Sequence, residues 1–219
     1  MAKPPKNHAA PAAVRTRRAY FDFKHGQLHV RTAFPTTGGF DEQVTLFCLH
    51  GSNGTSRTFA RLLPVIADVR SVYAPDLPGC GESDASPASA APGATVADSA
   101  TSDSAAAVAD LAADLRLRQI DLLGLQTGAA VALELAATKP ELVRRLVLVG
   151  LPSADGLSLV KQRALIMRTR LEAADTLPGI KKVVPNCKVV EMLDVGHDLF
   201  EAAPQGLVKQ LASFLGGRA

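Results

Sequence analysis

The chain has 219 residues, of which 47% are hydrophobic and 21% charged, and its formal net charge is +3. This length and composition fit one globular domain and exclude a largely disordered chain. No apolar run approaches the roughly 18 residues of a membrane-spanning helix, and the cysteines at positions 48, 80 and 187 form no CxxC pair. We therefore expect a cytoplasmic protein with reduced thiols, no metal and no cofactor.

Basic residues are concentrated at the beginning of the chain, where no acidic residue precedes Asp22. Prolines within this segment argue against a transit helix, and no apolar stretch of a secretory signal is present. We predict that residues 1–18 form a flexible basic tail rather than a nucleic-acid-binding arm, and that 19–219 form a single domain.

The first elements are predicted from periodicity. Alternating apolar residues over 20–30 indicate a hairpin of two strands, and the continuous apolar run 44–49 indicates a strand covered on both faces. A short strand is expected at 71–74. Between these two strands, helical spacing relates four apolar residues, Phe59, Leu62, Leu63 and Ile66.

Residues 84–102 are rich in Ala, Ser and Pro, which predicts a mobile surface loop that merges into a helix near Ser104. Strands are then predicted before position 126 and at 146–149, 164–167 and 189–193, with an Ala-rich helix to about Thr138. The closing helix is marked by Leu207, Leu211, Phe214 and Leu215. Such alternation of strands and helices predicts a mostly parallel sheet with helices on both faces, an α/β fold.

The segment Gly124-Leu125-Gln126-Thr127-Gly128 joins a predicted strand to a predicted helix. It has the spacing of a nucleophile elbow, G-x-Nuc-x-G, in which a serine normally stands on a strained turn. Glutamine occupies the position of that serine. A carboxamide does not attack a carbonyl as an alkoxide or thiolate does, so the pattern indicates an enzyme scaffold without its usual nucleophile.

Three further segments accompany this elbow in order: 49–54 (LHGSNG), 74–84 (APDLPGCGESD) and 196–198 (GHD). Together the four segments resemble the α/β-hydrolase superfamily over nearly the whole chain, from about Tyr20 to Leu215. The resemblance implies the α/β-hydrolase fold with an N-terminal antiparallel hairpin. The segment 151–163 leaves little room for the helical cap of most relatives, so we expect the cap to be absent or minimal.

The resemblance also implies roles for individual residues. Gly51, Ser52 and Asn53 lie where relatives supply one oxyanion-hole amide, and Thr127 lies where they supply another. His197 occupies the place of the general base. Because residue 126 carries neither a hydroxyl nor a thiol, His197 has no nucleophile beside it to deprotonate.

The acid that would orient His197 has two candidates. If the run 165–168 is the penultimate strand, Glu172 takes the acid position, and Asp155, after the strand at 146–149, is the alternative. Other nucleophiles are Cys80, Ser52 and Thr127, for which packing or turn roles are expected; Thr127 is expected to point back toward the sheet.

Two functions follow from these residues. The first is a non-hydrolytic relative that binds a small ligand or a partner protein through the former catalytic pocket. The second is an enzyme with non-standard chemistry, in which Gln126 positions water or donates a hydrogen bond and His197 is a general acid/base. Esterase activity through another nucleophile is a third reading. Neither nucleic acid nor a membrane is expected among the partners.

Overall fold

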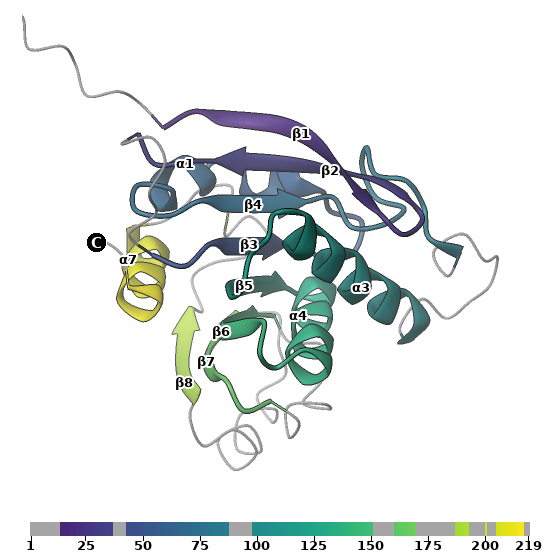
Figure 1. Ribbon diagram of the computed structural model, residues 1–219. Coiled ribbons are helices and arrows are strands. Elements are labelled where there is room, and N and C mark those ends of the chain that lie inside the picture. Colours follow the sequence, from purple (N-terminus) through teal and green to yellow (C-terminus); the bar gives the residue numbers. More distant parts are fainter. Residues whose placement is uncertain are drawn as a thin grey trace, which may run out of the picture.

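The computed structural model describes residues 14–36, 43–87, 98–150, 160–169, 187–192, 200 and 205–216. Within these residues eight strands form one sheet in the order β1-β2-β4-β3-β5-β6-β7-β8 (Figure 1). The strands are β1 Thr16–Phe23, β2 Gly26–Ala33, β3 Leu46–Leu49, β4 Val72–Pro75, β5 Ile120–Leu125, β6 Val143–Val149, β7 Arg163–Thr169 and β8 Cys187–Met192. The helices are the short 3-10 helix η1 Ser56–Phe59, α1 Leu63–Ile66, α3 Asp98–Asp114, α4 Thr127–Thr138 and α7 Gln205–Leu215.

The sheet is antiparallel at one edge and parallel elsewhere. β1 and β2 form an antiparallel hairpin, and β2 pairs antiparallel with β4. All pairings from β4 across to β8 are parallel. This arrangement confirms the predicted fold class, including the N-terminal hairpin and the mostly parallel sheet.

Helices cover both faces of the sheet, as predicted. Along β5, Leu122 packs into the core that α3 and α4 share, whereas Leu123 packs into the core beneath α1 and α7. This alternation is the two-residue period of a strand buried on both sides. In Figure 1, α3 and α4 lie together, and α7 lies apart from them near the amino end of β3.

Strand order reverses at β3 and β5. From β3 the chain passes to β4 on one side, and from β5 it passes to β6 on the other. In open parallel sheets the crevice outside the carboxyl ends of two such strands is where ligands bind. The loops that follow β3 and β5 therefore define the place to look for a site.

Three predicted boundaries need correction. β1 begins at Thr16, so part of the predicted tail 1–18 pairs with β2, because an exposed edge strand accepts arginines. α3 begins at Asp98, not near Ser104, since small residues are compatible with a helix. The single helix predicted over the apolar residues from Phe59 to Ile66 is instead two short helices, η1 and α1, and Pro64 lies in the first turn of α1. Residues 88–97 of the predicted loop and 151–159 of the cap segment lie outside the described residues.

A buried ionic cluster lies at the amino end of β5. Asp121 is fully buried, with ion pairs to Arg70 at 3.1 Å and to Arg144 at 2.6 Å. The second terminal nitrogen of Arg70 donates to the carbonyls of Leu215 and Gly216, where α7 ends. The cluster thus joins β5, β6 and the last helix at the end of the sheet opposite the crevice.

Candidate functional site

Gln126 occupies a strained turn between β5 and α4. Its backbone has φ 51° and ψ −114°, and it caps the helix without a side-chain hydrogen bond. Its N–H donates to the carbonyl of Val149 at 2.8 Å, and its carbonyl accepts from Ala129 at 2.9 Å. A positive φ is costly for a residue with a Cβ, by about 1–3 kcal/mol, and clusters at functional sites.

The two glycines that frame Gln126 are required by close packing. A Cβ at Gly124 would collide with the backbone of Gly128 and Ala129 at the start of α4. A Cβ at Gly128 would collide with the carbonyls of Leu49 and His50 at the end of β3. The strand–turn–helix arrangement predicted around position 126 is therefore present, and it lies directly against β3.

The loop after β3 approaches the same turn. Gly51–Gly54 form a turn closed by a 3.0 Å hydrogen bond from the Gly54 N–H to the Gly51 carbonyl, with Asn53 at φ 55°. The Ser52 hydroxyl donates to Oγ1 of Thr127 at 3.4 Å. Contrary to expectation, Thr127 does not point back into the sheet: its side chain is exposed. The two segments expected to supply oxyanion-hole amides are therefore neighbours.

The side chain of Gln126 extends over this loop. A Cβ built on Gly51 would lie 2.7 Å from Oε1 of Gln126 and 3.3 Å from its Cβ. Gln126 itself is half-buried. Its carboxamide thus covers the residue that immediately precedes the loop amides of Ser52 and Asn53.

Beside the turn lies a cavity of about 400 Å³. Its walls come from the loops after β3 and β4, from the first turns of α3 and from the start of α4. None of the described residues lining it is Asp, Glu, Lys or Arg. They are His50, Gly51, Ser52, Asn53, Leu77, Pro78, Gly79, Cys80, Ala100, Thr101, Ser104, Thr127 and Val131.

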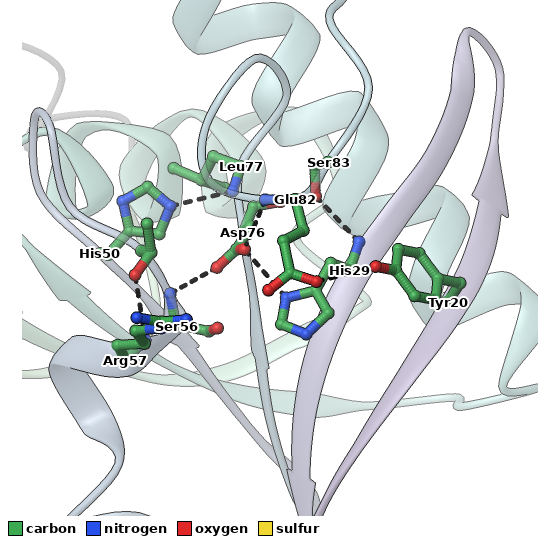
Figure 2. A network of polar contacts seen from close by, with 10 residues as sticks. Tyr20, His29, His50, Ser56, Arg57, Asp76, Leu77, Glu82 and Ser83 are labelled. Carbon is green, nitrogen blue, oxygen red and sulfur yellow. Dashed lines mark hydrogen bonds and ion pairs between the residues drawn. The ribbon is translucent and has the colours of Figure 1, made fainter.

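His50 joins two walls of this cavity. Its Nε2 accepts from the Leu77 N–H at 2.9 Å (Figure 2). Its Nδ1 donates to the Gly51 carbonyl at 2.9 Å. Burial lowers the pKa of His50, and the Gly51 carbonyl offsets part of that shift. The ring is therefore neutral with its proton on Nδ1. The sequence segment 49–54 contains His50, but the role of its ring was not predicted, because it depends on Leu77, 27 positions along the chain.

The two hydrogen bonds of the buried His50 ring predict a pH-dependent stability. The pKa of His50 is lower in the folded state than its unfolded value of 6.5. Its contribution to the free energy of unfolding is therefore complete above pH 6.5 and declines as the pH falls below 6.5. The free energy of unfolding should fall by up to about 1.4 kcal/mol per pH unit in that range. Urea unfolding between pH 7 and pH 5 should show a smaller decline for His50→Gln than for the wild type. Equal declines would contradict this assignment.

The alternative nucleophiles have no activating partner among the described residues. Cys80 is half-buried in the cavity wall, and burial followed by the charge of Asp76 raises the pKa of its thiol. Ser52 and Thr127 hydrogen-bond to each other. Three predicted site residues, His197, Glu172 and Asp155, lie outside the described residues, so their relation to Gln126 stays a prediction.

The chain belongs to the α/β-hydrolase fold family, because a family model of that description matches residues 44–175. A 2-hydroxymuconate semialdehyde hydrolase of Pseudomonas sp. (strain CF600) is 37% identical over 123 residues, covering 52% of this chain and 41% of that protein. The chain thus matches about two fifths of the length of this relative.

Solved structures agree on the fold. A predicted CIB-like hydrolase of Thermoplasma acidophilum has a TM-score of 0.76 at 16% identity, covering 92% of this chain and 98% of that one. A carboxylesterase of Bacillus subtilis has a TM-score of 0.76 at 16% identity, covering 93% of both chains. Within the described residues, no helix has the length and hydropathy to cross a membrane, and no three His, Cys, Asp or Glu residues are grouped to hold a metal.

Proposed function

We propose that this protein binds a small organic ligand reversibly in the cavity beside Gln126, without forming an ester with it. The observation that carries the proposal is a glutamine on a fully formed elbow turn. The backbone retains the strained geometry that presents residue 126, and the amide lone pair is delocalised. The turn therefore has the geometry of an elbow while position 126 provides no nucleophile.

The glutamine side chain also resembles a reaction intermediate in size. Its atoms Cβ–Cγ–Cδ(=O)–N correspond one for one to those of a carbamoylated serine, Cβ–Oγ–C(=O)–N. Water does not cleave the Cγ–Cδ bond as it cleaves an ester. With Oε1 over Gly51, this group takes the space where an acyl group would be attached. Only reversible occupation of the neighbouring cavity is then available to a ligand.

The lining indicates a small ligand that carries a carboxylate. Thr127 begins α4, so its N–H has no partner within the helix and lies at the positive end of the helix dipole. The loop amides and the hydroxyls of Thr127, which accepts from Ser52, and of Ser104 add donors, and no acidic side chain among the described lining residues opposes an anion. Leu77, Pro78 and Val131 provide an apolar side.

The second candidate, an enzyme with non-standard chemistry, is favoured by the relatives' names, which are those of hydrolases. Here His197 would be the general acid/base, and Gln126 would hold a water.

One experiment separates the candidates. The protein is incubated with a fluorophosphonate and with p-nitrophenyl acetate, and its intact mass is measured. We expect neither a mass increase nor turnover; turnover that His197→Ala abolishes would favour the enzyme.

Ligand binding is tested with phenylacetate, a small carboxylate with an apolar ring, by titration calorimetry. Phenethyl alcohol is the neutral control and should bind at least tenfold more weakly. Ala100→Phe on α3 places a ring in the cavity and should reduce phenylacetate affinity at least tenfold. Ala106→Phe, on the exposed face of the same helix, should leave it unchanged. Equal effects of the two variants would place binding elsewhere.

A further inference from the structure

Asp76 connects three parts of the chain just outside the cavity. Its carboxylate accepts from the N–H groups of Ser56 at 2.5 Å and Glu82 at 3.0 Å, and it faces Nδ1 of His29 at 2.9 Å (Figure 2). The side chains of His29 and Asp76 are only 2% and 3% exposed. Because a carboxylate only accepts, Nδ1 of His29 carries the hydrogen of this bond.

The backbone of His29 is tied to the same loop. The Asp76 N–H donates to the His29 carbonyl at 2.8 Å, and the His29 N–H donates to Oγ of Ser83 at 2.9 Å. The Ser83 hydroxyl in turn donates to the Asp76 carbonyl at 2.7 Å. Strand β2 therefore holds both the beginning and the end of the loop 76–83 through a single residue.

This loop is one wall of the candidate site. Its residues Leu77, Pro78, Gly79 and Cys80 line the cavity, and they begin immediately after Asp76. Leu77 also donates to His50, which holds the loop after β3. A rotation of the Asp76 carboxylate would therefore be transmitted to the cavity wall at the next residue.

Asp76 needs its donors to remain in this place. Burial alone would raise the pKa of Asp76, but hydrogen bonds from Ser56, Glu82 and His29 outweigh it and lower the pKa. Two of the three donors are backbone groups of the segments being joined. His29 donates through its side chain, and it comes from a strand outside both segments. Because β2 is part of the sheet, His29 holds the loop 76–83 in place relative to the sheet.

We propose that His29 is a positioning residue for the ligand cavity, whose Nδ1–H orients the Asp76 carboxylate and thereby fixes the wall formed by Leu77–Cys80. The effect of His29 on ligand binding rests on the proposed function, but its effect on the position of Leu77–Cys80 does not. An asparagine at position 29 can place an N–H where Nδ1 lies. A leucine fills a similar volume and donates nothing, so these two variants separate hydrogen bonding from packing.

The test uses Cys80 as a reporter within the wall. In a Cys187→Ser background, in which Cys48 is buried, the rate of iodoacetamide labelling at neutral pH is followed by intact mass. Burial raises the pKa of Cys80 and slows its reaction. His29→Leu should increase the labelling rate at least fivefold, and His29→Asn should remain within twofold of the unsubstituted background.

Val30→Ala is the matched control, because Val30 is the next residue of β2 and is buried in the core on the opposite face. It should lower the melting temperature without accelerating the labelling of Cys80. If Val30→Ala accelerates labelling as much as His29→Leu does, general destabilisation explains both and the proposal is overturned. An unchanged rate in folded His29→Leu overturns it as well.

A second variant covers the case in which His29→Leu does not fold. His29→Gln remains polar but places its amide one bond further out, so it should also accelerate labelling, by at least twofold; an unchanged rate again overturns the proposal. Phenylacetate titration is the second readout, with affinity expected to fall at least fivefold in His29→Leu and to be restored in His29→Asn. If the wild type binds no phenylacetate, the proposed function fails, while the labelling rates still decide the role of His29.

Discussion

Gln126→Ser is expected to convert the protein into one that a fluorophosphonate labels covalently and that hydrolyses p-nitrophenyl acetate. The substitution places a hydroxyl on a turn whose strained backbone and flanking glycines are already in place. It also removes the carboxamide from above Gly51, which uncovers the neighbouring loop amides for a developing oxyanion. The expected result is a mass increase of one phosphonyl group per chain, together with ester turnover absent from the wild type.

Two controls assign this activity. Gln126→Ala uncovers the loop equally but adds no nucleophile, so it should be neither labelled nor active. The double variant Gln126→Ser with His197→Ala should lose about 10²–10⁴-fold in turnover, the usual contribution of a general base. If Gln126→Ser is folded and is not labelled, the predicted alignment of His197 with position 126 is wrong.

The folding free energy should change little in Gln126→Ser. Residue 126 is half-buried, makes no side-chain cap and keeps its positive φ with either side chain. The strain of the turn is therefore common to both proteins. A gain of activity at nearly constant stability would show that the chemistry, and not the architecture, was altered at this position.

Local patterns in the sequence were sufficient for much of this fold. The apolar run containing Leu46–Leu49 is a strand buried on both faces, and the alternation over 20–30 is a hairpin. Gly124 and Gly128 identify the elbow because only glycine permits the contacts found there. In each case the cause lies within a few residues of the pattern.

The contacts that build the site walls were not predictable in this way. His29 meets Asp76 across 47 positions, and His50 meets Leu77 across 27. Such pairs depend on which strands become neighbours, and a histidine within an apolar strand gives no sign of its partner. Thr127 was placed wrongly for the same reason, since its contact is with Ser52 in another loop. The Asp121 cluster is a further example, because Arg70 is 51 positions away.

Asp121→Ala is expected to cause the largest loss of stability, about 3–5 kcal/mol in the free energy of unfolding, because it leaves the guanidinium of Arg70 buried without its counter-charge. The side chain of Arg70 is 3% exposed, so it cannot reach water without displacing the end of α7. Urea unfolding measures the loss. Glu191→Gln is the matched control, because it removes an ion pair with Arg168 in which the Glu191 side chain is 49% exposed. This control should lower the free energy of unfolding by at most about 1 kcal/mol. Combining Asp121→Leu with Arg70→Met should recover much of the loss, because a buried ion pair replaced by apolar side chains is often nearly neutral. A cost below about 1 kcal/mol for Asp121→Ala would mean that Arg70 is held by the carbonyls of α7 alone, and that the cluster does not anchor the last helix to the sheet.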